Sequence, residues 1–468
     1  MYNKDTMKNK TVNINFMKNS LLEMTVTGLG SNGEGVGKVQ GFTFFVPGAL
    51  AGEKIRFQAK QVKKNYGIGE LTKVIESSPD RVKPVCPVYR QCGGCQLQHL
   101  SYPGQLKVKR QQVIDALERL GHFKGVKVEP TLAANNPWNY RNKMQVPVAS
   151  GKKGSLEIGC FAQATHKVIN VEACFIQKKA NNDIAAVVRQ WMKEYKIPAL
   201  EEDARRGIVR HVMGRVGVAT GEVMAVLITN SQMVPHIKDL GKMLREAIPG
   251  FKTLVQNVNT RHTNVIMGEK SRIITGAGFI QDSIGDLTFN ISPESFFQVN
   301  SEQAAKLYGE ALKAAKLTGK ETVVDVYCGT GTITLFLAQK AARAIGIEIV
   351  PSAIKDARVN ARNNKIANAQ FVLGDAALEL PKLVEEGIKP DVIVLDPPRA
   401  GCDQRVINAI ASVKPKRVVY VSCNPASLAR DAEMLCKKGY AITKVQPVDL
   451  LPQTSHVETV VLMSRVKE

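Results

Sequence analysis

Five polar residues in the C-terminal half lie at or just after the ends of short apolar segments. These segments have the length of buried strands and alternate with helical patterns: Thr322–Val326, Ala344–Ile347, Gln370–Leu373, Val392–Leu395 and Arg417–Val421. Such alternation predicts a parallel sheet covered by helices. Ligands of these sheets bind beyond the carboxyl ends of the strands. The polar residues expected to gather there are Asp325, Glu348, Asp375, Asp396 and Cys423.

The first apolar segment leads into a glycine-rich turn, Asp325-Val326-Tyr327-Cys328-Gly329-Thr330-Gly331. Glycine lets a ligand approach the backbone closely. Glu348 lies 17 residues after Gly331, where a carboxylate can accept both hydroxyls of a ribose. Asp375 suits the edge of an adenine. This succession, a glycine-rich turn followed by carboxylates at the next two strand ends, resembles the class I S-adenosylmethionine-dependent methyltransferases. A dinucleotide site is the alternative, although the third glycine of Gly-x-Gly-x-x-Gly is missing.

The turn after the fourth strand is Asp396-Pro397-Pro398-Arg399. Consecutive prolines fix an extended turn that can press on a flat base. A similar Asp-Pro-Pro-aromatic motif serves enzymes that methylate the exocyclic amine of adenine, and these require no cysteine. This chain has Arg399 in place of the aromatic residue and offers a cysteine instead.

That cysteine is Cys423, in Ser422-Cys423-Asn424-Pro425, ahead of a helix start expected near Ser427. A lone cysteine is most often a small buried hydrophobe. At the end of a strand, however, local dipoles can hold it as a thiolate. Carbon 5 of uracil is too poor a nucleophile to attack a sulfonium methyl group unaided. A thiolate that adds to carbon 6 gives carbon 5 carbanion character.

Such a reaction also needs a base to remove the proton from carbon 5. Glu458, in His456-Val457-Glu458-Thr459, lies at the edge of a late apolar strand. Burial there would raise its pKa towards a useful range. His456 is the rival base, or a residue that orients a neighbour.

Five motifs occur in order and together resemble the RNA (uracil-5-)-methyltransferases. They are Phe296-Phe297-Gln298-Val299-Asn300, the Asp325–Gly331 turn, Asp396–Arg399, Ser422–Pro425 and His456–Thr459. The resemblance implies that Cys423 is the nucleophile and Glu458 the base. It also implies that the cofactor S-adenosylmethionine or the target base is contacted by Gln298, Tyr327, Glu348 and Asp396.

A second group of cysteines precedes this region: Cys86-x5-Cys92-x2-Cys95, with Cys174 as a fourth ligand 79 positions beyond Cys95. Cys160 competes for the fourth place. Four thiolates suit zinc as well as an iron–sulfur cluster, and free buried cysteines are a third possibility. The resemblance favours a [4Fe-4S] cluster, as in family members that act on 23S ribosomal RNA.

The chain has 468 residues and a formal net charge of +22. A large positive excess attracts polyanions. The segment Met1–Ser20 is polar and lysine-rich rather than signal-like, and no apolar stretch suffices to span a bilayer. We therefore expect a cytoplasmic protein that binds RNA, is not membrane-bound and is a monomer.

Three domains are expected. Residues 17–75 read as short strands with glycine turns, and Val46-Pro47-Gly48-Ala49-Leu50-Ala51-Gly52-Glu53 resembles the TRAM domain, an RNA-binding, OB-like β-barrel. Residues 76–280 form a mixed α+β domain with the cysteines and a helix at 103–120, which in this family packs on the catalytic domain. Residues 281–468 form an α/β class I methyltransferase domain with a seven-stranded, mostly parallel sheet.

The target is expected to be 23S ribosomal RNA, because relatives that act on the transfer RNA T-loop typically lack the barrel and the cysteines. Uridine methylation in that T-loop remains an alternative. Exocyclic amino-group methylation predicts that Cys423 is dispensable. An RNA-binding factor with an inactive catalytic domain predicts RNA affinity without methyl transfer.

Overall fold

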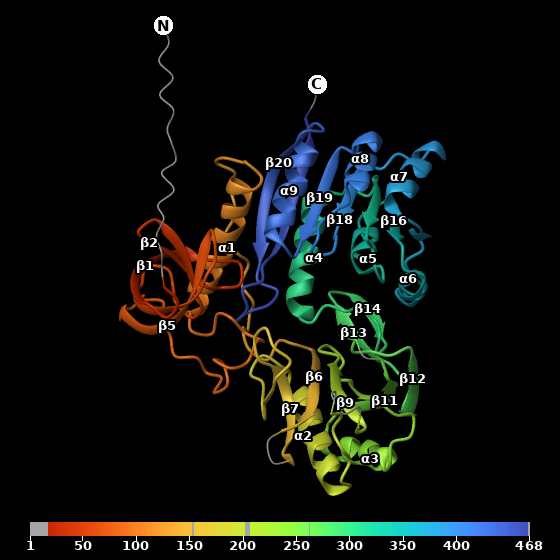
Figure 1. The fold of residues 1–468 in the computed structure, drawn as a ribbon. Helices are drawn as coiled ribbons and strands as arrows, with labels where there is room; N and C mark the ends of the chain where they lie inside the picture. The colour runs from red at the N-terminus through yellow and green to blue at the C-terminus, as the bar shows by residue number, and fades with distance from the viewer. Residues whose placement is uncertain (1–16, 152–153, 202–205, 262, 467–468) are drawn as a thin grey trace. The chain divides into compact units, whose positions relative to one another are not determined.

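The computed structural model describes residues 17–151, 154–201, 206–261 and 263–466. The chain divides into two compact units (Figure 1). The first holds the N-terminal residues up to Lys83 together with His99–Ser101, and the second holds the remainder. Most of Met1–Ser20 lies outside the described residues. Among the described helices, none is long and apolar enough to cross a membrane.

The first unit contains a closed five-stranded barrel, as the glycine-punctuated strands predicted. Its strand order is β1-β2-β3-β5-β4. The strands are β1 (Leu21–Leu29), β2 (Gly35–Val39), β3 (Phe42–Val46), β4 (Lys54–Val62) and β5 (Tyr66–Glu76). Phe44, Ile55 and Phe57 fill the interior and are fully buried, so burial of alternate residues on each strand stabilises the barrel.

Glu53 at the end of the Val46–Glu53 motif is fully buried in this unit. Arg81 donates to it through Nε at 2.5 Å and Nη2 at 2.7 Å. Burial by itself would raise the pKa of Glu53, but the hydrogen bonds from Arg81, Leu50 and Ser78 outweigh it and hold the pKa below its usual value. This ion pair explains why the motif ends in glutamate.

Three lysines of the barrel unit lie beside carboxylates or an aromatic ring. Lys54 pairs with Glu76 at 3.9 Å and Lys60 pairs with Glu70 at 2.6 Å. Lys63 lies 5.4 Å from the centroid of the Tyr66 ring. Exposed pairs of this kind are weak, so phosphates can still compete for these lysines.

In its described residues, the second unit contains two seven-stranded sheets. The first along the chain, here called the central sheet, has the strand order β12-β11-β10-β9-β6-β7-β8. Its strands are β6 (Lys143–Ser150), β7 (Leu156–Phe161), β8 (Val168–Asn170), β9 (Val209–Val216), β10 (Val223–Thr229), β11 (Phe251–Val258) and β12 (Lys270–Thr275). Helices α2 (Lys179–Glu194) and α3 (Ile237–Ala247) share a core with this sheet. Residues 263–267, between β11 and β12, lie in a loop.

The C-terminal sheet has the order β17-β16-β15-β18-β19-β21-β20. Its strands are β15 (Thr322–Val326), β16 (Arg343–Glu348), β17 (Ala369–Leu373), β18 (Val392–Leu395), β19 (Arg417–Ser422), β20 (Tyr440–Val448) and β21 (Glu458–Arg465). The first five are parallel, and β21 lies antiparallel between β19 and β20. This is the predicted class I methyltransferase sheet.

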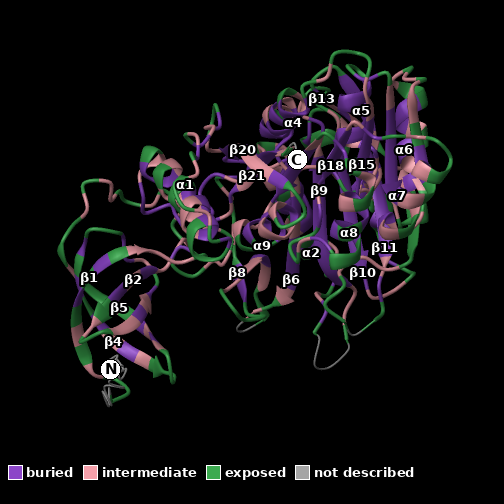
Figure 2. Ribbon diagram, turned by 90° about the horizontal axis from the view of Figure 1, so that it is seen from above, coloured by how far each residue is buried: buried purple, intermediate pink, exposed green. Residues whose placement is uncertain are grey.

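Helices cover both faces of this sheet, and its strands are buried between them (Figures 1 and 2). One core contains Val323 and the other contains Val324, which explains why the strands are apolar at successive positions. The helices are α4 (Ser301–Ala315), α5 (Thr332–Ala338), α6 (Pro351–Asn363), α7 (Ala376–Glu385), α8 (Gln404–Val413) and α9 (Pro425–Cys436). A hairpin of β13 (Ile280–Ile284) and β14 (Leu287–Ile291) precedes α4.

Helix α1 (Tyr102–Arg119) contributes Val113, Ala116 and Leu117 to the core that also contains residues of α9 and β20. Asn300 caps α4, because its side chain accepts the amide of Gln303. The start of α9 differs from the expected one near Ser427. Helix α9 begins at Pro425 behind the cap Asn424, two residues before Ser427.

Candidate active site

Cys423 and Glu458 meet where β19 ends and β21 begins. The two strands are antiparallel, and their last pair is Ser422 opposite Thr459. Cys423 and Glu458 are the next residues outward on each strand. Glu458 and Asp396 both act on the Cys423 thiol electrostatically. Three strand ends of the same sheet thus converge on one thiol and two carboxyl groups.

Both carboxyl groups hold protons more strongly than usual. Burial raises the pKa of Asp396 to about 7. Burial, followed by the charge of Asp396, raises the pKa of Glu458 to about 8, while Arg399 and Lys109 oppose the rise. The expectation that burial brings Glu458 into a useful range is confirmed. Both groups can therefore exchange protons near neutral pH.

The expectation that Cys423 rests as a thiolate is wrong. Burial, Glu458 and Asp396 raise the pKa of the thiol, and the nearby Arg399 only partly offsets them. Helix α9 does begin directly behind this residue, but burial and the two carboxyl groups hold the pKa of the thiol above its ordinary value. Cys423 must therefore lose its proton to a neighbour before it can attack a ligand.

Arg399 and His456 form the exposed rim of this group. The Arg399 Nη2 donates to the His456 Nε2 at 3.3 Å. Burial, followed by the charge of Arg399, lowers the pKa of His456 to about 4. A neutral imidazole that accepts from Arg399 orients that cation and is poorly suited to act as the general base.

Tyr308 of α4 is a site residue that the sequence did not reveal. Burial raises the pKa of its hydroxyl, with Asp396 and Glu458 contributing, while a hydrogen bond with the Gln298 side chain opposes the rise. Tyr308 is only 3% exposed, so in the sequence it fits the apolar, core-facing pattern of its helix. Its only signal is a hydroxyl on a core-facing stripe, since buried tyrosines usually have a polar partner.

Gln298 is positioned by the central sheet. Asn142 donates its side-chain amide to the Gln298 carbonyl at 3.0 Å, and its backbone amide to the Val299 carbonyl at 2.8 Å. Arg215 donates to the carbonyls of Pro293 at 3.2 Å and Ser295 at 2.5 Å. The loop that carries Gln298 is therefore tied to β6 and β9.

The glycine turn forms a cradle at the end of β15. Tyr327 and Gly331 adopt left-handed conformations, with φ of 67° and 82°. A Cβ at Gly331 would lie 2.8 Å from the Phe371 ring, so only glycine fits. Burial raises the pKa of Asp325 to about 7. The Thr334 hydroxyl donates to Asp325 Oδ2 at 2.6 Å, whereas the buried Asp325 Oδ1 has no hydrogen-bond partner in the described part of the chain.

Glu348 faces this cradle. It accepts backbone amides from Gly329 at 3.1 Å, Ile349 at 2.8 Å and Val350 at 3.0 Å. Oε1 accepts from Ile349 and Val350, whereas Oε2 accepts only from Gly329 and retains capacity for a further hydrogen bond. Asp375 is engaged differently: it caps α7 through Ala377, and its other oxygen lies 3.3 Å from Arg405.

Tyr327 turns its hydroxyl towards Cys402 and the Asp403 backbone. Cys402, the rival nucleophile, is 5% exposed and its Sγ donates to the Tyr420 hydroxyl at 3.8 Å. It is thus a packed cysteine behind Tyr327, separate from the group around Cys423.

The comparisons with known proteins agree with this geometry. Residues 161–466 match the family model described as tRNA (Uracil-5-)-methyltransferase, and residues 15–72 match the TRAM domain. An RNA methyltransferase of Halalkalibacterium halodurans, named as uncharacterized, is 49% identical, and the match covers 95% of this chain and 97% of the relative. A similarly named protein of Clostridium acetobutylicum is 46% identical, with 96% and 98% covered.

The chain belongs to the RNA (uracil-5-)-methyltransferase family. Its N-terminal barrel is a TRAM domain. Among solved structures, the Pyrococcus abyssi tRNA (uracil-54, C5)-methyltransferase in complex with S-adenosyl-L-homocysteine superposes with a TM-score of 0.76 at 27% identity. The match covers 94% of this chain and all of the other.

This family member brings five cysteines together near the end of β7. Cys160 hydrogen-bonds Cys92 and lowers the pKa of that thiol to about 6. Cys174 and Cys92 act electrostatically on Cys95, and Cys92 acts on Cys86. In the described part of the chain, no three potential ligands converge closely enough to hold a single metal ion.

The cysteine loop of the methyltransferase also supports the catalytic loop. The amides of Gln96 and Leu97 donate to the Gln453 carbonyl at 3.0 and 2.9 Å. The Gln105 side chain donates to the Gln453 Oε1 at 3.0 Å. Gln453 lies five residues before Glu458, so hydrogen bonds connect the cysteine loop to the segment that leads into the proposed base.

Proposed function

We propose that this enzyme methylates carbon 5 of a uridine in RNA, with Cys423 as the nucleophile and Glu458 as the base. The observation that carries the proposal is the meeting of a thiol with two carboxyl groups of raised pKa at adjoining strand ends. Exocyclic amino-group methylation would need no thiol there. A binding protein without catalysis would not need groups that titrate near neutral pH.

The reaction balances with these groups. Cys423 gives its proton to the nearby Asp396 carboxylate, which leaves Glu458 free to act as the later base, and the sulfur adds to carbon 6 of the uracil. Carbon 5 then takes the methyl group that S-adenosylmethionine would supply when bound, and S-adenosylhomocysteine leaves. The Glu458 carboxylate removes the proton from carbon 5. The bond between sulfur and carbon 6 breaks, and the methylated base and the Cys423 thiolate are released.

The glycine cradle suits S-adenosylmethionine. The orphaned Oδ1 of Asp325 is a buried acceptor at the floor of the cradle, and such atoms usually meet a donor. Glu348 would accept the ribose hydroxyls, with Tyr327 near the same ligand. Asp396 follows β18, which lies between β15 and β19 in the sheet, and Asp396 and Gln298 would contact the cofactor or the uracil.

A [4Fe-4S] cluster bound by Cys86, Cys92, Cys95 and Cys174 is the proposal for the cysteine group. Zinc would require four sulfurs about 2.3 Å from one point, and the resemblance to family members that act on 23S ribosomal RNA favours the cluster instead. Such a cluster is held by four thiolates. Cys160, hydrogen-bonded to Cys92, would be a neighbour of the cluster and not one of its ligands.

The proposed target is 23S ribosomal RNA, on the resemblance of the barrel and cysteine group to the family members that act on it. A second candidate, a uridine in transfer RNA, is favoured by one observation. The Pyrococcus abyssi tRNA enzyme matches this chain over 94% of its length, so this architecture also occurs with a transfer RNA substrate.

Methylation of unmodified 23S ribosomal RNA and unmodified transfer RNA by the purified enzyme tests the proposal. Products are digested and 5-methyluridine is located by mass spectrometry. We expect 5-methyluridine in the ribosomal RNA. If 5-methyluridine appears only in transfer RNA, then transfer RNA, and not 23S ribosomal RNA, is the target. Methylated adenine or cytosine in place of 5-methyluridine would overturn the proposed chemistry.

A further inference from the structure

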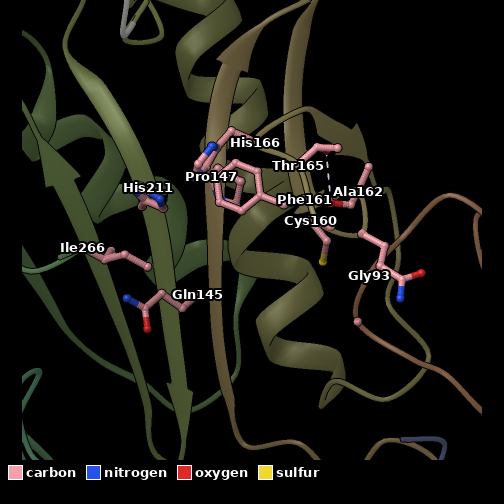
Figure 3. A pocket seen from close by; sticks show the side chains of 13 residues that line it. Gly93, Gln145, Pro147, Cys160, Phe161, Ala162, Thr165, His166, His211 and Ile266 are labelled. Atoms are coloured by element: carbon pink, nitrogen blue, oxygen red, sulfur yellow. Dashed lines mark hydrogen bonds between the residues drawn. The ribbon is translucent and has the colours of Figure 1, made fainter. Parts of the chain in front are cut away.

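A cavity of about 570 Å³ lies on the central sheet, outside the group around Cys423. It is bounded by β6, β9, the turn between β7 and β8, and the cysteine loop. Figure 3 shows the Phe161 ring beside Pro147 and His166, with Gln145 and His211 on neighbouring strands. Its volume is within the range of small-ligand sites, roughly 300–1,000 Å³.

We propose that this cavity binds a second, unpaired nucleobase of the RNA strand whose uridine enters the active site. The inference rests on the proposed function, since it assumes an RNA substrate. It adds a recognition site that lies apart from the chemistry.

The lining has the chemistry of a base site. Phe161 and His166 stand edge to face, with ring centroids 5.6 Å apart, and offer flat apolar surfaces for stacking. The half-buried Gln145 side chain lines the cavity, and its amide offers both a donor and an acceptor. RNA-binding proteins recognise unpaired bases through such combinations of stacking and edge hydrogen bonds.

His211 adds a second polar group. It is 6% exposed, and its Nδ1 has no hydrogen-bond partner among the residues that the structure describes. Burial, followed by the charge of Arg210, lowers its pKa to about 4, so the ring is neutral. The described lining residues include no lysine, arginine or carboxylate. A neutral heterocycle therefore fits this cavity better than a phosphate or a metal ion.

The cysteine loop forms one wall of the cavity. Cys92 bridges to Ala162, and the Gly93 amide donates to the Phe161 carbonyl at 3.0 Å. A Cβ on Gly93 would lie 3.2 Å from both the Phe161 carbonyl and the Gln163 Cα. The loop thus fits tightly against the turn that carries Phe161.

Strand β6 connects the cavity to the active site. Asn142, just before β6, holds the backbone of the Gln298 loop. Gln145 and Pro147 lie three and five residues further along the chain, which is roughly 10–17 Å at the rise of a strand. One RNA strand can therefore reach both places.

Photocrosslinking with generic RNA tests the inference without knowledge of the target. The probes are single-stranded decamers of random sequence, each with one 4-thiouridine or 6-thioguanosine, and the full-length protein is digested and mapped. We expect crosslinks in the peptides that contain Phe161 and His211. Crosslinks confined to the barrel and to the region of Cys423 would overturn the inference.

Two variants sharpen this test. Gln145→Leu removes the amide, and Phe161→Leu keeps an apolar side chain on β7 but removes the ring. Each should lower crosslinking at the cavity at least about fivefold, the smallest effect expected for a lost base contact. Gln232→Leu, an exposed change in the same domain, is the matched control. Equal crosslinking in all four proteins would contradict the inference.

Failure of the inference and failure of the proposed function give different results. Methyl transfer to intact RNA is measured separately on the same wild-type preparation. Absent methylation with cavity crosslinks would reject the reaction but keep the base site. Normal methylation without cavity crosslinks would reject the base site alone.

Discussion

Lys109 and Asp449 form an ion pair in which both side chains are fully buried, with 2.5 Å between Nζ and Oδ1. Lys109 also donates to the Leu451 carbonyl at 3.0 Å. The pair joins α1 to the segment that leads into Glu458, although the two residues are 340 positions apart. A helix that precedes the seven-stranded sheet of the central domain in sequence therefore helps to position the proposed base.

Lys109→Met should strongly destabilise the protein, because it leaves Asp449 buried without a partner. We expect the free energy of unfolding in urea to fall by about 3–5 kcal/mol. Lys109→Met combined with Asp449→Leu should recover most of this loss. Lys107→Met, an exposed change on the same helix, is the control. A loss no larger than that of the control would show that the pair contributes little.

Glu348→Gln should weaken S-adenosylmethionine binding while leaving the fold intact. The change removes a charge-assisted acceptor worth roughly 1.5–3 kcal/mol, so affinity should fall at least about tenfold. Isothermal titration calorimetry measures this. Glu386→Gln, at an exposed helix end, should bind as the wild type does. Unchanged affinity in Glu348→Gln would reject the ribose assignment.

The release of the carbon 5 proton should depend on pH through Glu458. A carboxyl group with a pKa of about 8 is mostly protonated at pH 7, so its activity as a base rises with pH and levels off above 8. Tritium release from 5-tritiated uridine RNA in single turnovers follows this step. Because Arg399 lowers the pKa of Glu458, Arg399→Met should move the midpoint to higher pH. A midpoint that does not move would assign the titration to another group.

Much of this arrangement could be predicted from the sequence, because the buried strands of a parallel sheet are continuous apolar runs. The segments Thr322–Val326 and Val392–Leu395 coincide with β15 and β18. Residues at their ends therefore had to share one edge of the sheet. The barrel was equally accessible, since Phe42–Val46 and its glycine neighbours fit only short strands and turns.

Features set by tertiary contacts could not be predicted. The protonation of Cys423 depends on Asp396 and Glu458, which arrive from two other strands. Tyr308 has the periodicity of a core residue, and nothing local indicates that its hydroxyl meets Gln298. The pair of Lys109 with Asp449 has no sequence signature, because each residue alone looks like a solvated charge.

Protein purified without air should be brown and contain about four iron and four sulfide ions per chain, as a [4Fe-4S] cluster requires. Cys174→Ala should lose the metal. Cys160→Ala, the matched control, should retain the metal, because Cys160 is not one of the four proposed ligands. If only Cys160→Ala lost the metal, Cys160 would be the fourth ligand and Cys174 would not. A colourless protein with one zinc ion would reject the cluster and leave the methyltransferase assignment intact.

The covalent step through Cys423 is the centre of this account, and RNA carrying 5-fluorouridine tests it most directly. After methyl transfer, this base has no removable proton at carbon 5, so the bond to the enzyme persists and survives denaturing gels. We predict that the wild type and Cys402→Ala form the adduct, because Cys402 is packed against Tyr420. Cys423→Ala should form no adduct and no 5-methyluridine. Normal methylation by Cys423→Ala would contradict the account.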